Sequence, residues 1–126
     1  MEDHKIRVSI VDDHPVIRSA LRMFLERVPE IKVAGEAANG KEAIQMVQND
    51  CPDVIILDLS MPGMGGMEVI RALRQVGNSV YIIVFSAIND RETITHILNS
   101  GANEYFVKDT DIHRLVSAIR KVRVNH

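Results

Sequence analysis

Five polar side chains of this 126-residue chain stand directly after short apolar runs. They are Asp12, Asp13, Asp58, Ser86 and Lys108. If those runs end at the same edge of one sheet, three carboxylates, a hydroxyl group and an ammonium group converge there. Two carboxylates about 4 Å apart repel each other by about 1 kcal/mol in water, and by several times more where the dielectric is lower. The group therefore calls for a cation, and oxygen ligands with room for water favour Mg²⁺ over a dedicated Ca²⁺ cage.

This combination of groups is equipped for phosphoryl transfer. A carboxylate beside a metal ion, a lysine and a hydroxyl donor can attack phosphorus and become an aspartyl phosphate. The metal ion and Lys108 would offset negative charge on the phosphoryl oxygens, and Ser86 would donate from its hydroxyl group. Each residue alone is an ordinary cap, turn or surface residue, so the prediction depends on all of them converging.

Alternating hydrophobic periods predict the elements that would position these residues. Runs rich in β-branched residues predict strands at Ile6–Val11, Ile31–Gly35, Val54–Leu57, Val80–Phe85 and Asn103–Val107. Apolar residues at helical spacing predict five helices. The first three are expected at Pro15–Val28, Lys41–Asn49 and Met67–Val76. The fourth is expected to begin at Asn89 or Asp90 and to end before Gly101, and the fifth to span 112–122. The fourth helix should turn Ile94, Ile97 and Leu98 inward, and Asn39 with Glu42 resembles a helix cap.

Strand and helix alternate five times without a break in composition, which predicts a doubly wound parallel sheet. The run Val54–Leu57 is apolar on both faces, as is typical of a central strand between two layers of helices. Ligands of such sheets bind beyond the carboxyl ends of the strands. The polar residues named above stand at those ends.

Composition limits the class of protein. A chain of this length forms one domain, and 46% hydrophobic with 25% charged residues excludes disorder, collagen-like repeats and a disulfide scaffold. The net charge of −2 argues against a nucleic-acid-binding surface. Cys51 is the single cysteine, and no run approaches the roughly twenty apolar residues of a membrane span. We therefore expect a cytoplasmic protein without direct nucleic-acid or membrane contacts.

Four segments together resemble the receiver domain (CheY-like) of two-component response regulators. They are Val11-Asp12-Asp13-His14-Pro15, the segment 57–64 (LDLSMPGM), Phe85-Ser86-Ala87 and Tyr105-Phe106-Val107-Lys108-Asp109. The opening Asp-Asp-His-Pro and Gly35-Glu36-Ala37 look most like the receivers of LuxR/NarL-type transcriptional regulators. The resemblance implies a flavodoxin-like (βα)5 fold with strand order 2-1-3-4-5. It also implies that residues 1–126 form a single receiver domain, with a C-terminal helix-turn-helix output domain missing from this chain.

The resemblance also implies a role for each residue. Asp58 would accept a phosphoryl group from a phosphohistidine on a sensor histidine kinase or phosphotransfer protein. The Mg²⁺ ligands would be Asp13, Asp58 and the backbone carbonyl of Ser60, with Asp12 acting through a bound water. The groups around the phosphoryl oxygens would be Lys108, Ser86 and Ala87, and the switch pair would be Ser86 and Tyr105. Further partners implied are the chain's own output domain and, on phosphorylation, a second copy of the chain.

The sequence departs from the receiver pattern at several positions. Asp109 follows Lys108 where many receivers have proline, and Gly65 stands where an aspartate or asparagine is frequent. Both leave the geometry of their loops open. Arg7 and Ser9 interrupt the first strand, although a central strand is expected to be buried on both faces.

Ordinary structural roles remain as alternatives for single residues. Asp12 and Asp13 could cap the helix that begins at Pro15, and Asp58 could be a turn residue. Tyr105 could simply pack against a helix. The histidines, His14 among them, lack metal-ligand spacing, so we expect them to be solvated.

Three other functions use a similar fold. A phosphatase that turns over an aspartyl phosphate needs a general acid two residues after the nucleophile, where this chain has Ser60. A flavin carrier needs a phosphate cradle after the first strand, where Asp12 and Asp13 would repel the phosphate. A degenerate receiver would act only as a binding platform, which the intact acidic set disfavours. We therefore expect a signalling module and not an enzyme with an external substrate.

Overall fold

The computed structural model describes residues 5–122, in which five strands alternate with five helices. The strands are β1 (Ile6–Val11), β2 (Ile31–Ala37), β3 (Val54–Leu57), β4 (Tyr81–Ser86) and β5 (Glu104–Val107). The helices are α1 (Pro15–Glu26), α2 (Gly40–Asp50), α3 (Gly66–Gln75), α4 (Arg91–Asn99) and α5 (Ile112–Arg120). Every predicted element is present, and the boundaries differ from the predicted ones by a few residues at most.

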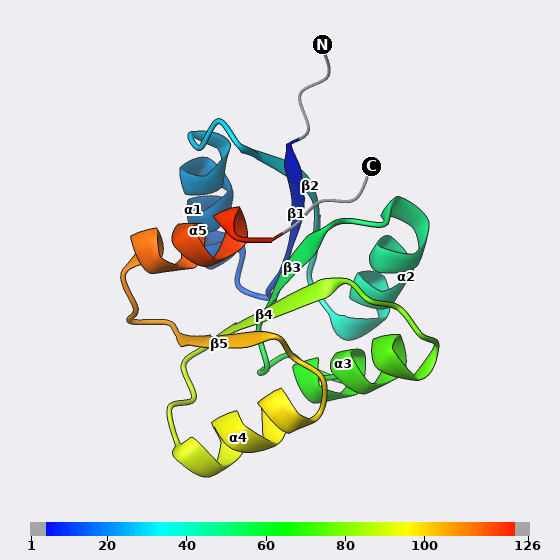
Figure 1. Cartoon of the computed structure of the whole chain (residues 1–126). Helices are drawn as coiled ribbons and strands as arrows, with labels where there is room; N and C mark the ends of the chain where they lie inside the picture. The colour runs from blue at the N-terminus through cyan, green and yellow to red at the C-terminus, as the bar shows by residue number, and fades with distance from the viewer. Residues whose placement is uncertain (1–4, 123–126) are drawn as a thin grey trace.

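The strands form one parallel sheet in the order β2-β1-β3-β4-β5, which confirms the predicted flavodoxin-like topology. Figure 1 shows α1 and α5 together on one face of this sheet and α2, α3 and α4 on the other. β3 is buried along its whole length, as its apolar sequence predicted. Val54 and Ile56 belong to the core on the α1 and α5 side, and Ile55 and Leu57 to the core on the opposite side. This alternation fixes the register of the central strand, because a slip of one residue would exchange the two faces.

Side-chain caps fix the starts of three helices. Asn39 Oδ1 accepts from the N–H of Glu42 at 2.9 Å, as predicted, and Asp90 Oδ2 accepts from the N–H of Thr93 at 2.9 Å. Asp111 Oδ1 accepts from the N–H of His113 at 2.9 Å. Each cap satisfies a backbone donor that would otherwise lack a partner at the helix terminus.

One predicted core position is wrong. In α4, Ile97 is buried as expected, but Leu98 is 38% exposed. α4 spans only Arg91–Asn99, and Ile97 is its one fully buried residue. A helix that contacts the sheet through so narrow a face leaves the neighbouring apolar residue in solvent.

The structure accounts for Arg7 but not for the polarity of Ser9, the other polar residue of β1. The Arg7 guanidinium donates to the carbonyls of Asp50 and Cys51 at 2.7 and 3.0 Å, so it satisfies carbonyl groups at the end of α2. Ser9 is fully buried and lies beside Gly35, where the register between β1 and β2 shifts. A small side chain fits this position, but the Ser9 Oγ is buried there without a hydrogen-bond partner among the described residues.

Within residues 5–122, none of the helices has the length and the apolar character that crossing a membrane requires.

Candidate functional site

The carboxyl ends of β1 and β3 bring the acidic residues together. The two strands pair in parallel up to Val11 and Leu57, and the N–H of Asp58 donates to the Val11 carbonyl at 2.9 Å. The N–H of Asp12 donates to the Ala37 carbonyl of β2 at 3.1 Å. Backbone hydrogen bonds therefore fix the positions from which both carboxylates project.

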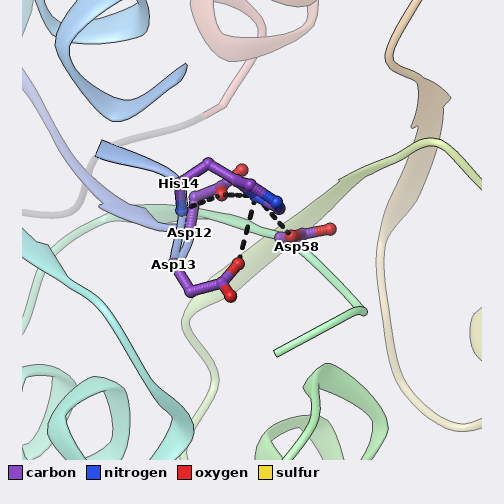
Figure 2. A group of neighbouring side chains, drawn as sticks. All are labelled: Asp12, Asp13, His14 and Asp58. Atoms are coloured by element: carbon purple, nitrogen blue, oxygen red, sulfur yellow. Dashed lines mark hydrogen bonds and ion pairs between the residues drawn. The ribbon is translucent and has the colours of Figure 1, made fainter. Parts of the chain in front are cut away.

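Asp12, Asp13, His14 and Asp58 form a cluster that we call the acid pocket (Figure 2). One potential ligand atom from each residue lies within 4.8 Å of those of the others. Asp12 and Asp58 are each only 2% exposed, whereas Asp13 is partly exposed. The predicted convergence of three carboxylates is thus confirmed.

Lys108 supplies a positive charge at this pocket. Its Nζ lies 3.1 Å from Asp12 Oδ2 and 3.5 Å from Asp58 Oδ2. The N–H of Lys108 donates to the Ser86 carbonyl at 2.8 Å, which holds the end of β5 against β4. The Lys108–Asp109 peptide is trans, and the N–H of Thr110 donates to the Val107 carbonyl at 2.8 Å. The loop therefore turns directly after Lys108 without the proline of many receivers.

Burial raises the pKa of Asp58 above its usual range, and the negative charge of Asp12 raises it further. The ammonium group of Lys108 and the N–H of Ser60 act in the opposite direction. Two oxygens of the pocket, Asp13 Oδ1 and Asp58 Oδ2, are buried and have no hydrogen-bond partner among the described residues. Asp13 Oδ1 lies 3.1 Å from His14 Nδ1 and Asp58 Oδ2 lies 3.5 Å from Lys108 Nζ, but neither contact is a hydrogen bond. A buried carboxylate oxygen without a hydrogen bond is costly, so these atoms fit a site that completes its coordination with a cation.

His14 is the residue that the sequence interpretation missed. Its Nδ1 lies 2.8 Å from Asp12 Oδ1, 3.1 Å from Asp13 Oδ1 and 3.9 Å from Asp58 Oδ2. The side chain is 55% exposed, as expected for a solvated histidine, but its ring also contacts the acidic residues. Metal-ligand spacing in the sequence gave no signal of this contact, because Asp58 comes from the residue after β3, far from His14 along the chain.

The alternative that Asp12 or Asp13 caps α1 is wrong. The N-cap of α1 is His14, which makes no side-chain cap hydrogen bond, and Pro15 occupies the first turn as predicted. Asp12 Oδ1 instead accepts from the N–H of His14 at 2.8 Å. This hydrogen bond fixes Asp12 relative to His14 within the acid pocket, and it does not cap α1.

Ser86 and Tyr105 are linked through the backbone of Ile88. Ser86 is fully buried, and its Oγ accepts from the N–H of Ile88 at 3.2 Å. The Tyr105 hydroxyl donates to the carbonyl of the same residue at 2.7 Å, and its ring packs on the core of the α2, α3 and α4 side. Ala87, between Ser86 and Ile88, is exposed. Ser86 and Tyr105, the predicted switch pair, are thus both hydrogen-bonded to the backbone of Ile88, in the loop before α4.

The loop after Asp58 packs closely against the pocket. The N–H of Ser60 donates to Asp58 Oδ1 at 3.4 Å, and the Ser60 side chain is exposed. A Cβ at Gly66 would lie 2.7 Å from the Asp58 carbonyl oxygen, so glycine permits the close approach of α3. Gly65 is the N-cap of α3, with an extended backbone. The N–H of Gly65 donates to Glu68 Oε1 at 3.1 Å, so the loop is held at the position where the sequence departs from the receiver pattern.

The fold and the site together define a class, that of receiver-type signalling domains with an acidic pocket at the carboxyl edge of a five-stranded parallel sheet. The family model described as the response regulator receiver domain matches residues 8–120. The chain therefore belongs to the response regulator receiver family.

Individual relatives agree with this assignment. The nitrate/nitrite response regulator protein NarL of Escherichia coli is 38% identical over 114 residues, which cover 90% of this chain and 53% of that protein. A protein-glutamate methylesterase/protein-glutamine glutaminase of Nocardioides is 38% identical over 120 residues, covering 94% and 33% respectively. The crystal structure of a LuxR-family response regulator from Aurantimonas is 34% identical with a TM-score of 0.87, covering 92% of this chain and 83% of that one.

This chain spans about half the length of NarL and a third of that of the methylesterase. The shared part is a receiver domain close to those of LuxR/NarL-type regulators.

Proposed function

We propose that Asp58 accepts a phosphoryl group from a phosphohistidine of a sensor histidine kinase or phosphotransfer protein, and that the chain is a cytoplasmic phospho-switch. The observation that carries this proposal is the buried Asp58 carboxylate, whose Oδ2 lacks a hydrogen-bond partner among the described residues and lies 3.5 Å from Lys108 Nζ. The carboxyl edge of the sheet is the side from which a donor would approach, and the neighbours of Asp58 can offset the charge that a phosphoryl group brings.

The phosphoryl transfer is a single displacement at phosphorus. A carboxylate oxygen of Asp58 forms the new bond to phosphorus, the bond between phosphorus and the donor imidazole nitrogen breaks, and that nitrogen leaves with the bonding pair. Lys108 already lies beside Asp58 and is positioned to pair with a phosphoryl oxygen. Ala87, which follows Ser86, is small and exposed, which supports access by the donor.

The donor set fits Mg²⁺. The carboxylates of Asp13 and Asp58 and the carbonyl of Ser60 would hold the ion, and Asp12 would act through a bound water. The ion would neutralise negative charge as the phosphoryl group approaches the three carboxylates. The unpartnered oxygens of Asp13 and Asp58 support this assignment.

Ser86 and Tyr105 would transmit the effect of phosphorylation at Asp58 to the surface of the domain. If the Ser86 hydroxyl turns toward a phosphoryl oxygen, its Oγ leaves the N–H of Ile88. The same residue accepts from Tyr105 through its carbonyl, so a shift of this loop releases the Tyr105 hydroxyl. Movement of one buried hydroxyl would thus alter the surface of α4, β5 and α5.

We also propose a wider role, by analogy with the LuxR/NarL-type regulators that this chain resembles. Residues 1–126 would form a single receiver domain, and a helix-turn-helix output domain absent from this sequence would regulate transcription. Its partners would be the donor protein, that output domain and a second copy of the chain on phosphorylation, without direct nucleic-acid or membrane contacts. Ser60, where an aspartyl-phosphate phosphatase needs a general acid, supports a switch without turnover of an external substrate.

Intact mass spectrometry after incubation with acetyl phosphate tests this function. The proposal expects one phosphoryl adduct that requires Mg²⁺, is absent from Asp58→Asn and is retained in Asp109→Asn, a matched change at an exposed aspartate. An adduct of equal yield in Asp58→Asn would refute the assignment. Steady release of phosphate from simple phosphate esters would favour the phosphatase, and a yellow purified protein would favour the flavin carrier.

A further inference from the structure

Arg18, in the first turn of α1, links this helix to β2 and to the loop after β1. Its Nη1 donates to the backbone carbonyl of Asp12 at 2.6 Å, and its Nε donates to Glu36 Oε1 of β2 at 3.2 Å. The side chain of Arg18 is only 19% exposed and that of Glu36 is 28% exposed, so water reaches little of either charge. A charge-assisted hydrogen bond in such surroundings is stronger than one in solvent.

The hydrogen bond from Arg18 holds the peptide unit that joins Asp12 to Asp13. The Asp12 carbonyl and the N–H of Asp13 belong to one planar unit, so the direction of this carbonyl sets the orientation of the plane between the two Cα atoms. β1 ends at Val11, so the carbonyl lies beyond the strand and Arg18 supplies its partner. The N–H of Asp12 is held from β2, by the Ala37 carbonyl at 3.1 Å. Both backbone groups of Asp12 are therefore fixed, one by β2 and one by Arg18.

We propose that Arg18 is a positioning residue of the acid pocket, which holds the Asp12–Asp13 peptide so that both carboxylates face Asp58 in the geometry that phosphoryl transfer requires. Arg18 acts through the Asp12 backbone and not by contact with the reacting atoms. The consequence for transfer rests on the proposed function of Asp58, but the effect of Arg18 on the backbone does not. Groups that orient metal ligands from behind typically change metal affinity or activity by about 10–100-fold when they are removed.

The charge of Arg18 would act in the opposite direction from its hydrogen bond. If Arg18 influenced the pocket through charge alone, its removal would strengthen Mg²⁺ binding, because one cation repels another. Loss of the hydrogen bond to the Asp12 carbonyl leaves the peptide free to reorient, and binding weakens because the ion must then order its ligands. The two explanations therefore predict changes of opposite sign in Mg²⁺ affinity.

Arg22 provides a matched control on the same helix. It pairs with the same carboxylate, that of Glu36, and with Glu26, and among the described residues its side chain makes no hydrogen bond to Asp12. Arg18→Met and Arg22→Met remove the same charge, leave a similar apolar stem and each take one partner from Glu36. They differ in the hydrogen bond to the Asp12 carbonyl. Arg18→Lys keeps the charge, but its single ammonium group cannot reproduce the fork of donors that reaches two acceptors.

Native-state hydrogen exchange of the whole chain in EDTA tests the inference without metal ion or phosphoryl donor. We compare exchange at the N–H of Asp12 with exchange at the N–H of Asn103, which donates to β4 at the opposite edge of the sheet. Arg18→Met should speed exchange at Asp12 relative to Asn103 by at least about tenfold, the effect of losing a hydrogen bond to a charged donor. Arg22→Met should change this ratio by less than about twofold. A general loss of stability would speed both amides alike, so an unchanged ratio in Arg18→Met would overturn the inference.

Mg²⁺ affinity, measured by calorimetry, gives a second readout. Arg18→Met should bind Mg²⁺ about tenfold more weakly than wild type, Arg18→Lys should lie between them, and Arg22→Met should match wild type. Equal or tighter Mg²⁺ binding in Arg18→Met would count against a positioning role. Phosphorylation of wild-type Asp58 together with an unchanged exchange ratio in Arg18→Met refutes only this inference. Both predicted effects of Arg18→Met, in a chain that acetyl phosphate never modifies at Asp58, refute only the proposed function.

Discussion

Removing the charge of Asp58 should stabilise the fold when no metal ion is bound. Asp12 and Asp13 place carboxylate oxygens within 4.8 Å of Asp58, and Lys108 Nζ lies 3.5 Å away. With an effective dielectric constant of about 20, each acidic neighbour costs about 3 kcal/mol, and Lys108 offsets roughly 5 kcal/mol of the total. The repulsion that remains, together with burial of the carboxylate, makes Asp58→Asn more stable by about 1–2 kcal/mol in EDTA.

Thermal and urea unfolding at pH 8 measure this difference. A gain of that size raises Tm by about 5 °C in a domain of this length. The pKa of Asp58 is raised in the folded protein, so its neutral form is the favoured one and stability falls as the pH rises through that pKa. The advantage of Asp58→Asn should therefore shrink as the pH falls through the raised pKa of Asp58, because its carboxyl group becomes neutral in the folded protein.

Mg²⁺ should narrow the difference in stability between the two proteins. At ten times its dissociation constant the ion stabilises wild type by about 1.4 kcal/mol, and Asp58→Asn less, because one ligand is weakened. Asp109→Asn, a change at an exposed aspartate, should leave stability nearly unchanged. An Asp58→Asn protein that is no more stable than wild type in EDTA would show that the pocket is not under electrostatic strain.

Three further substitutions test other parts of the structure. Tyr81→Phe removes a 2.6 Å hydrogen bond to Glu104 and should cost about 1–2 kcal/mol in urea unfolding at pH 7. Burial and Glu104 raise the pKa of Tyr81 to about 12, so wild type should lose this advantage between pH 10 and about 12, and a constant difference would contradict the assignment. Cys51 has a φ of 48°, so Cys51→Gly should raise stability by up to about 1 kcal/mol, and a lower Tm would count against strain there. Gly66→Ala puts a Cβ 2.7 Å from the Asp58 carbonyl oxygen, so it should cost about 1–3 kcal/mol and slow phosphorylation; unchanged values would mean that the loop can move away.

The fold and the acidic residues were predictable because both depend on short-range patterns. Val54–Leu57 is apolar on both faces and is followed at once by Asp58, so strand and carboxylate are fixed by the same few residues. Parallel pairing then brings Asp12 and Asp58 to one edge of the sheet, and the end of β5 carries Lys108 to them. The prediction of the site did not depend on the path of any long loop.

His14 and Leu98 were not predictable by the same reasoning. The position of the His14 ring depends on the rotamer that places Nδ1 beside Asp12 and Asp13, and periodicity carries no information about rotamers. Leu98 has the spacing of a buried residue, but its exposure depends on how narrow a face α4 offers to the sheet. The link from Ser86 through Ile88 to Tyr105 likewise depends on the path of a loop.

The most direct test of the central claim is to map the phosphorylated residue. Protein treated with acetyl phosphate and Mg²⁺ is reduced with borohydride, which converts an aspartyl phosphate to homoserine, and is then digested and sequenced by mass spectrometry. We predict homoserine at Asp58 and at neither Asp12 nor Asp13, because the buried Asp58 Oδ2 lies beside Lys108 and has no hydrogen-bond partner among the described residues. Homoserine at another aspartate, with Asp58 unmodified, would contradict it.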